Sequence, residues 1–146
     1  MNSKNSMKAT WIGIISGVIL ALFLKVVQSI TDHQVYTLLL NVDYIPIVKE
    51  YQFPEVVEVL FHLIVSVILC TVFVFLYDRG RGTFRKHIIF FSLAINVLIG
   101  LLLYPTTSFS ERTPSVTSIP ALCWWVLGHT IYGALVGILL GRNNKK

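Results

Sequence analysis

The sequence predicts an all-α integral membrane protein, a single domain (residues 1–146) built as a bundle of four transmembrane helices. Three observations support this fold class. The 146-residue chain is 55% hydrophobic and only 13% charged, whereas about a quarter of the residues in soluble domains are charged. Its apolar residues gather in four long runs, and its basic residues lie at the ends of those runs. The net charge of +5 therefore does not indicate binding to nucleic acid.

Each apolar run is long enough for a helix that crosses the hydrocarbon core, which takes about 20 residues. The runs cover residues 11–30, 56–77, 88–104 and 121–140. Pro54 and Pro120 lie where proline suits the first turn of a helix, while Pro105 follows the third run. Gly141 follows the fourth run and is expected as its C-cap. Between the first two runs, the aromatic and apolar residues 35–42 predict a short interfacial helix.

The basic residues predict the orientation of the bundle. Nine of the twelve precede the first run, separate the second from the third, or follow the fourth: Lys4, Lys8, Arg79, Arg81, Arg85, Lys86, Arg142, Lys145 and Lys146. Cytoplasmic loops are enriched in lysine and arginine, so both termini are expected in the cytoplasm. A cleaved signal peptide ending near Ser29 is the alternative interpretation of the first run. Lys25 interrupts that run, which favours a retained span.

The two cysteines, Cys70 and Cys123, lie at different depths in their runs. At the rise of an α-helix their depths differ by roughly 15–20 Å. A disulfide needs Cα atoms within about 7 Å, so none is expected. Neither cysteine belongs to a CxxC motif, and the sequence predicts no metal site.

Several polar residues fall inside the runs, where such groups are expensive and usually face a partner or a cavity. Lys25, His62 and His129 are expected within a layer roughly 5 Å thick in the outer half of the membrane. The candidate substrate- or ion-binding residues are Lys25, Glu58, His62, Ser66, Asn96 and His129. The alternative is structural: Lys25 extends to the headgroups, and the histidines form hydrogen bonds between helices.

Small residues recur at four-residue spacing in the first and fourth runs. These are Gly13, Gly17, Gly133, Gly137 and Gly141, a pattern typical of close helix packing in membranes. Trp124 and Trp125 are expected to anchor the fourth helix at the outer interface.

Four segments, in order along the chain, are similar to the YagU-like family of bacterial inner-membrane proteins, a domain of unknown function. They are "GVILALFLK" (17–25), "FHLIVSVIL" (61–69), "LLLYPTT" (101–107) and "LGHTIYGALVGILLGR" (127–142). The positions that match the pattern of that family are Lys25, His62, Ser66, Pro105, Gly128 and His129. The resemblance implies a multi-pass protein of the bacterial plasma membrane, linked to acid tolerance.

Three functions remain open. The first is proton or ion homeostasis, or transport of a small solute, through an outward-facing Lys/His cluster, since histidine titrates near physiological pH. Four helices are few for a carrier, so a homo-oligomer is expected. The second is an accessory protein that binds other membrane proteins through its glycines. The third is a haem b protein with His62 and His129 as axial ligands, although no cofactor is the main expectation. No motif of a hydrolase or metalloprotease is present, and an enzyme is the less favoured reading.

Overall fold

The structure is a computed structural model that describes residues 3–42, 51, 53–80 and 82–142, without the side chain of Thr83. Within these ranges the chain forms helices and connecting loops, with no strand. The elements are α1 (Ser3–Thr31), α2 (Val35–Leu40), α3 (Glu55–Arg79), α4 (Thr83–Lys86), α5 (Ile88–Leu103), the 3-10 helix η2 (Tyr104–Phe109) and α6 (Ile119–Arg142).

Four of these helical segments are long and apolar enough to cross a membrane: α1, α3, α5 together with η2, and α6. Many large apolar side chains on them point away from the protein and remain exposed, among them Trp11, Leu22, Ile30, Val56, Ile64, Ile68, Phe90 and Leu102. An apolar surface of this extent is stable against lipid rather than water. The expected fold class is confirmed, and the chain is a multi-pass membrane protein.

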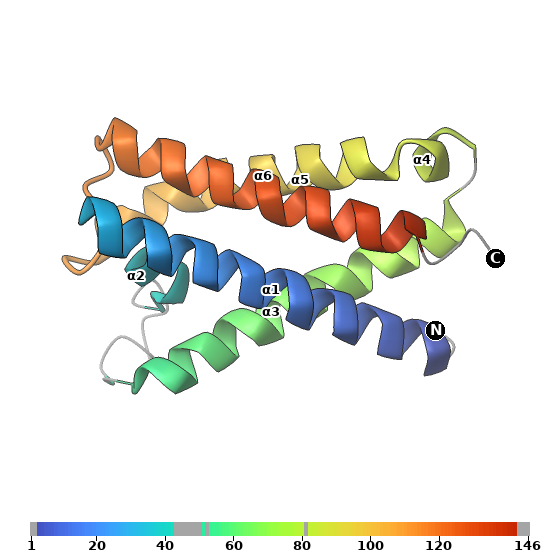
Figure 1. Ribbon diagram of the computed structural model, residues 1–146, viewed down its shortest axis with the longest axis horizontal. Coiled ribbons are helices and arrows are strands. Elements are labelled where there is room, and N and C mark those ends of the chain that lie inside the picture. The colour runs from blue at the N-terminus through green and yellow to red at the C-terminus, as the bar shows by residue number, and fades with distance from the viewer. Residues whose placement is uncertain (1–2, 43–50, 52, 81, 143–146) are drawn as a thin grey trace.

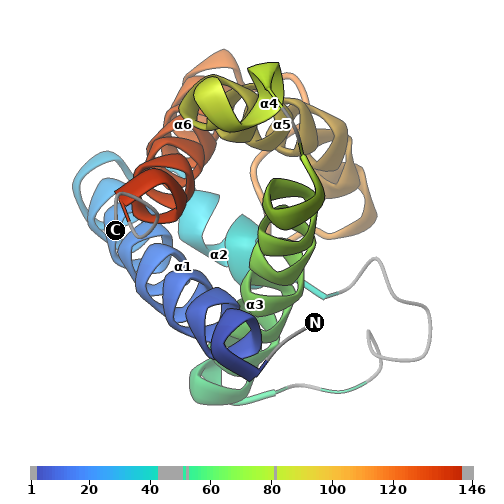
Figure 2. The ribbon, with the colours of Figure 1, turned by 90° about the vertical axis from the view of Figure 1, so that its right-hand side faces the viewer.

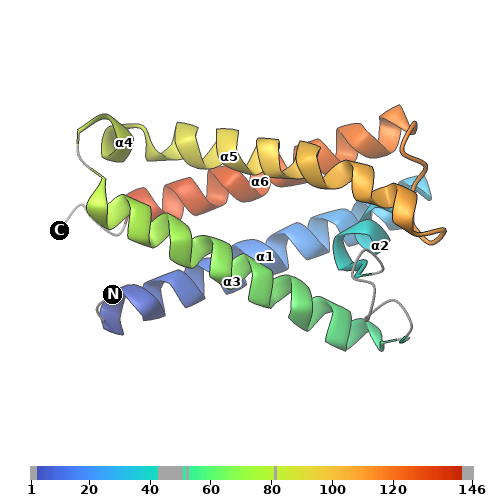
Figure 3. The same cartoon turned by 180° about the vertical axis from the view of Figure 1, so that it is seen from behind.

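The four long helices do not pack symmetrically. Helix α1 packs along both α3 and α6, and α6 packs along α5. Figure 1 shows α1 and α3 crossing as an X, with α5 and α6 side by side above them. As a result, α3 and α5 lie close where α4 connects them and diverge toward the other end of the bundle (Figure 3). Viewed along the bundle, α2 lies inside the ring of the four long helices, beside α1 and α3 (Figure 2).

The two ends of the bundle differ in charge. One end carries the start of α1, the end of α3, α4 and the end of α6 (Figure 1). We call it the basic end because these segments carry Lys8, Arg79, Arg85, Lys86 and Arg142. The opposite end carries α2 and η2, and we call it the α2 end. At the basic end Asn5 donates a hydrogen bond to Asp78, which links α1 to α3. There the guanidinium of Arg85 donates to the carbonyl oxygen of Tyr77 at 2.9 Å, which fixes α4 against the end of α3.

Several boundaries differ from those that hydropathy predicts. Helix α1 begins at Ser3 rather than at residue 11, because the polar residues before Trp11 continue the helix beyond the apolar stretch. The short helix expected over residues 35–42 is present, with bounds Val35–Leu40. Gly141 is not a C-cap, since the described part of α6 remains helical through Arg142.

The glycines mark where helices approach most closely. A Cβ atom on Gly13 would lie 2.7 Å from the Cα of Val67, and one on Gly17 would lie 2.9 Å from the Ser66 hydroxyl, so both face α3. On α6, a Cβ on Gly133 would lie 2.8 Å from the Cα of Leu93, and both this glycine and Gly137 face α5. Real Cβ atoms essentially never come this close to backbone, so the observed packing requires glycine at Gly13, Gly133 and Gly137. At Gly17 a Cβ would displace the side chains of Ser66 and Leu63.

Gly141 differs from the other four glycines. A Cβ there would meet only the side chain of Ile88, at 3.7 Å, which is an ordinary contact. The other four are covered by helices of the same chain. A protein partner would therefore have to use a different surface from the glycine faces on which the accessory-protein interpretation was based.

Gly137→Ala and Gly141→Ala form a matched pair that tests this packing. Alanine improves helix propensity at both sites by up to about 1 kcal/mol. At Gly137 the new Cβ would lie 2.6 Å from the Cα of Ile89, and overpacking of this kind costs about 1–3 kcal/mol. Unfolding in mixed micelles should show Gly137→Ala less stable than Gly141→Ala. Equal stability of the two variants would contradict the close approach of α5 and α6.

Candidate functional site

A cavity of about 310 Å³ lies where α3 diverges from α5. Residues of α3, α5 and α6 form its walls, and the leucines and following residues of α2 close it toward the α2 end. Its apolar lining includes Leu20, Leu38, Leu39, Leu40, Phe61, Ile64, Val65, Leu69, Ile99 and Leu103. Among these apolar side chains stand Glu58, His62, Ser66, Asn96, His129 and Tyr132. An apolar pocket with a few convergent polar groups is the usual form of a small-molecule site.

His129 is the more buried of the two cavity histidines and is only 6% exposed. Its Nδ1 lies 3.0 Å from the carbonyl oxygen of Trp125, one turn earlier in α6. A carbonyl oxygen can only accept, so in the neutral ring the proton is on Nδ1. The ring fits beside α5 because residue 100 is glycine: a Cβ there would lie 2.8 Å from the Cγ of His129.

Trp125 supports this arrangement from the same helix. Its ring lies 4.4 Å from that of His129, centroid to centroid, and its indole N–H donates to the carbonyl oxygen of Gly100 at 2.8 Å. The residue is 3% exposed. The expectation that Trp125 anchors the helix at the interface is therefore wrong, because its one polar atom finds a backbone acceptor inside the bundle.

His62 lies on α3 at the other side of the cavity. Its Nε2 is 3.1 Å from the carbonyl oxygen of Gly17. By the same reasoning the neutral ring donates from Nε2, and its Nδ1 is the acceptor nitrogen. The hydrogen bond links α3 to α1, and this is the structural role that the sequence offered as an alternative.

A short chain of hydrogen bonds joins α1, α3 and α6 about one helical turn from the histidines, toward the basic end. The hydroxyl of Ser66 donates to the carbonyl oxygen of Gly13 at 2.7 Å. The Tyr132 hydroxyl lies 2.8 Å from the Ser66 oxygen, and it must be the donor because the serine proton is already engaged. The thiol of Cys70 lies 3.6 Å from the Tyr132 oxygen. Cys70 is a buried free thiol, and Cys123 is a free thiol on the surface.

Asn96 contributes an amide from α5. It is 1% exposed, and its Nδ2 donates to the carbonyl oxygen of Ser92 at 2.8 Å. The amide oxygen has no hydrogen-bond donor among the residues that the structure describes. Asn96 therefore adds an acceptor oxygen to the cavity wall, beside the second N–H of the same amide.

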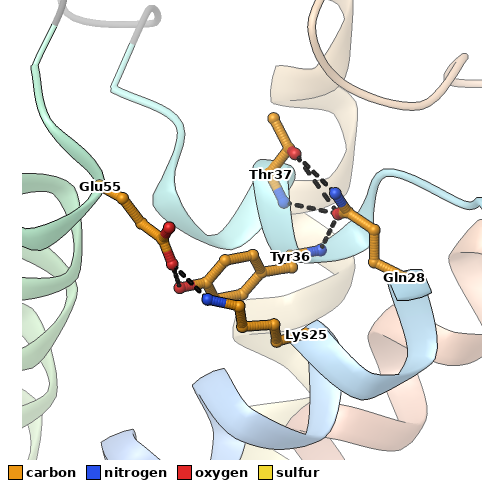
Figure 4. A network of polar contacts seen from close by, with 5 residues as sticks. All are labelled: Lys25, Gln28, Tyr36, Thr37 and Glu55. Atoms are coloured by element: carbon orange, nitrogen blue, oxygen red, sulfur yellow. Dashed lines mark hydrogen bonds and ion pairs between the residues drawn. The ribbon is translucent and has the colours of Figure 1, made fainter.

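Lys25 does not join the histidines. Its ammonium lies 2.6 Å from Oε1 of Glu55, and the Tyr36 hydroxyl donates to the same oxygen at 2.7 Å (Figure 4). Lys25 and Glu55 are about half exposed, and they line a second hollow at the α2 end. The expected cluster of one lysine and two histidines is therefore replaced by a pair of histidines and a separate ion pair. Burial and the bond to Glu55 raise the pKa of Tyr36, so its hydroxyl remains a donor.

Gln28 fixes α2 over the cavity. Its Oε1 accepts from the backbone N–H groups of Tyr36 and Thr37, at 2.9 and 3.0 Å (Figure 4). These N–H groups lie in the first turn of α2, where a helix has no acceptor of its own. The amide of Gln28 thus caps α2 from α1 and holds its leucines in the cavity wall.

Glu58 forms the rim of the cavity toward the α2 end. Its side chain is 7% exposed, and its Oε1 accepts from both terminal nitrogens of Arg112, each at 3.3 Å. Arg112 lies in the loop between η2 and α6, so this ion pair connects the start of α3 to that loop. The negative charge of Glu58 is therefore balanced by Arg112 and not by a histidine.

Sequence reasoning did not select Tyr132, Trp125, Gly100 or Arg112 as parts of the site. Tyr132 follows His129 by three residues and so shares its helix face, which is a signal that was present in the sequence. Gly100 and Arg112 carried no such signal, because only the relative placement of α5, α6 and the loop brings them to the site.

The described residues contain no group of three or more His, Cys, Asp and Glu side chains that could hold a metal ion. For haem, His129 presents Nε2 with its Nδ1–H held by a carbonyl, which suits an axial ligand. His62 has the opposite arrangement, because its Nε2 already donates to Gly17. Haem b thus remains the lesser alternative.

The chain was compared with protein-family models, with curated proteins and with solved structures, and it matches none of them. The resemblance to the YagU-like family remains a prediction from the quoted segments.

Proposed function

We propose that this protein binds a small, largely apolar solute within the membrane and takes part in its transport. The observation that carries this proposal is the cavity between α3 and α5, which combines an apolar lining with the nitrogens of His62 and His129. Ions are less suitable occupants, because Lys25 lies in another hollow and Glu58 is paired with Arg112.

The packing of the bundle supports a binding role. Helices α3 and α5 are separated where the cavity lies, so a solute dissolved in the bilayer can approach from between them. Helix α2 covers the same space toward the α2 end, held by Gln28. Because α2 is short, it can move with less disruption of packing than any of the long helices.

We further propose that the basic end faces the cytoplasm and that the membrane is the bacterial plasma membrane. The charge asymmetry of the two ends supports the orientation, and the resemblance to the YagU-like family supports the membrane. The cavity then opens in the outer half of the bilayer. Transport across the whole membrane through so small a bundle is best served by a homo-oligomer, whose copies would meet through lipid-facing surfaces.

Reporter fusions test the orientation. A reporter joined after Arg142 should behave as cytoplasmic, and one inserted at Ser110, between η2 and α6, should behave as external. The reason is the enrichment of lysine and arginine at the basic end. Alkaline phosphatase and green fluorescent protein activities measure the two locations in bacterial cells. The reverse pattern would contradict the proposed outward position of the cavity.

Ile99→Trp and Leu98→Trp test the cavity as a binding site. Ile99 lines the cavity, so tryptophan there fills the space, whereas Leu98 is 54% exposed on the lipid-facing surface. Wild-type protein in nanodiscs should show saturable binding of 1-aminoanthracene by fluorescence. Ile99→Trp should weaken this binding at least about tenfold, a loss of about 1.4 kcal/mol, and Leu98→Trp should leave it unchanged. Absence of saturable binding to the wild type, or equal binding to both variants, would overturn the proposal.

A further inference from the structure

We infer that the occupant of the cavity is a neutral, lipid-soluble molecule whose polar head donates a hydrogen bond, as a phenol or an alcohol does. The inference rests on the proposed function and deepens it by naming the chemical class of the solute. It follows from where the protons of the cavity wall are directed.

The hydroxyl and indole protons of the described lining residues are all engaged inside the protein. Ser66 donates to Gly13, and Tyr132 donates to Ser66. The Thr106 hydroxyl donates to the carbonyl oxygen of Leu103 at 2.7 Å, and the indole of Trp125 donates to Gly100. These hydroxyl and indole groups therefore have no free proton for a ligand, and the second N–H of the Asn96 amide is a donor that remains.

Acceptors, in contrast, are left over. Each histidine uses its single proton on a backbone carbonyl, so Nε2 of His129 and Nδ1 of His62 keep their lone pairs. Neither nitrogen has a hydrogen-bond donor within the described ranges of the chain, and the same is true of the Asn96 amide oxygen. A ligand that donates a hydrogen bond to one of these acceptors would remove the cost of leaving it unpaired in an apolar cavity.

The charged residues of the cavity wall favour a ligand whose polar head is neutral. Glu58 is the only carboxylate among the lining residues that the structure describes, and no lysine or arginine lines the cavity there. Because Arg112 already balances Glu58, a cationic ligand would enter an apolar site without a free counter-charge. Burying an unpaired charge is far more costly than burying a hydroxyl group that is hydrogen-bonded.

The volume and the apolar lining of the cavity indicate the size and chemistry of the rest of the ligand. A volume of about 310 Å³ lies at the lower end of small-molecule sites. The lining on α2 and α3 is mainly leucine, isoleucine, valine and phenylalanine, which suits a hydrocarbon body. Such a molecule partitions into the bilayer, from which the separation of α3 and α5 gives it access.

A matched pair of ligands tests the inference on wild-type protein. The probes are 4-butylphenol and its methyl ether, 4-butylanisole, which keeps the oxygen and loses the donor. Affinities are measured in nanodiscs by displacement of 1-aminoanthracene and expressed per mole fraction of ligand in the bilayer. The phenol should bind about three- to tenfold more tightly than the ether, which is the effect of one hydrogen bond.

We assign Nε2 of His129 as the acceptor because His129 is the more buried of the two histidines, and His129→Phe tests this assignment. The variant keeps an aromatic ring and lacks Nε2, so the ratio of phenol to ether affinity should fall toward one. His87→Phe is the control, because His87 is exposed at the basic end outside the cavity, and it should retain the preference. If His129→Phe does not fold, the comparison of the two ligands on wild-type protein still decides the central question.

The outcomes separate this inference from the proposed function. Equal binding of the phenol and the ether would overturn the donor inference and leave the cavity as an apolar binding site. Tighter binding of 4-butylbenzylamine, which is a cation at neutral pH, would overturn the neutral head. A preference for the phenol that persists in His129→Phe would overturn the assignment of His129 as the acceptor. Failure of 1-aminoanthracene itself to bind would contradict the proposed function, and this inference with it.

Discussion

The close approach of helices at glycine is the constraint on which the rest of the structure depends. Gly13 and Gly17 let α1 lie against α3, and Gly133 and Gly137 let α6 lie against α5. No comparable contact joins α3 to α5 in the described part of the chain. These contacts fix α3 to α1 and α5 to α6, and α1 and α6 pack on each other. Because α3 crosses α1 at an angle, α3 is separated from α5 toward the α2 end. The cavity is a consequence of this asymmetric packing.

The low polarity of the membrane explains the pattern of hydrogen bonds in the site. Lipid offers no hydrogen-bond partner, so donors inside a bundle must find acceptors in the protein. Here the acceptors for Ser66, His62, Trp125 and His129 are backbone carbonyls on neighbouring turns or helices. The His62 bond joins α3 to α1, the His129 bond lies within α6, and each fixes its histidine as a proton donor toward the protein. The opposite nitrogen of each ring is then left as an acceptor, so structural and binding roles are compatible in one residue.

Much of the fold could be predicted from hydropathy and spacing, because the bilayer imposes the length of a span and lysine and arginine mark its ends. The glycine spacing likewise indicated which faces of α1 and α6 pack closely. The site was harder to predict. Depth alone placed Lys25 with the histidines, but depth does not give the direction of a side chain around the helix, and Lys25 points to Glu55. Trp125 reads as an interfacial residue by position and is buried, because Gly100 offers its indole an acceptor.

The most direct test of this account is the protonation of the His129 ring in the membrane. Selective ¹⁵N labelling of histidine and solid-state NMR in lipid bilayers report which nitrogen carries the proton, and His129→Phe assigns the signal by its loss. The account predicts a neutral ring protonated at Nδ1, with an unprotonated Nε2 signal that shifts upfield when 4-butylphenol is added and accepts its hydrogen bond. A ring protonated at Nε2, or an Nε2 signal that does not respond to the phenol, would contradict the account.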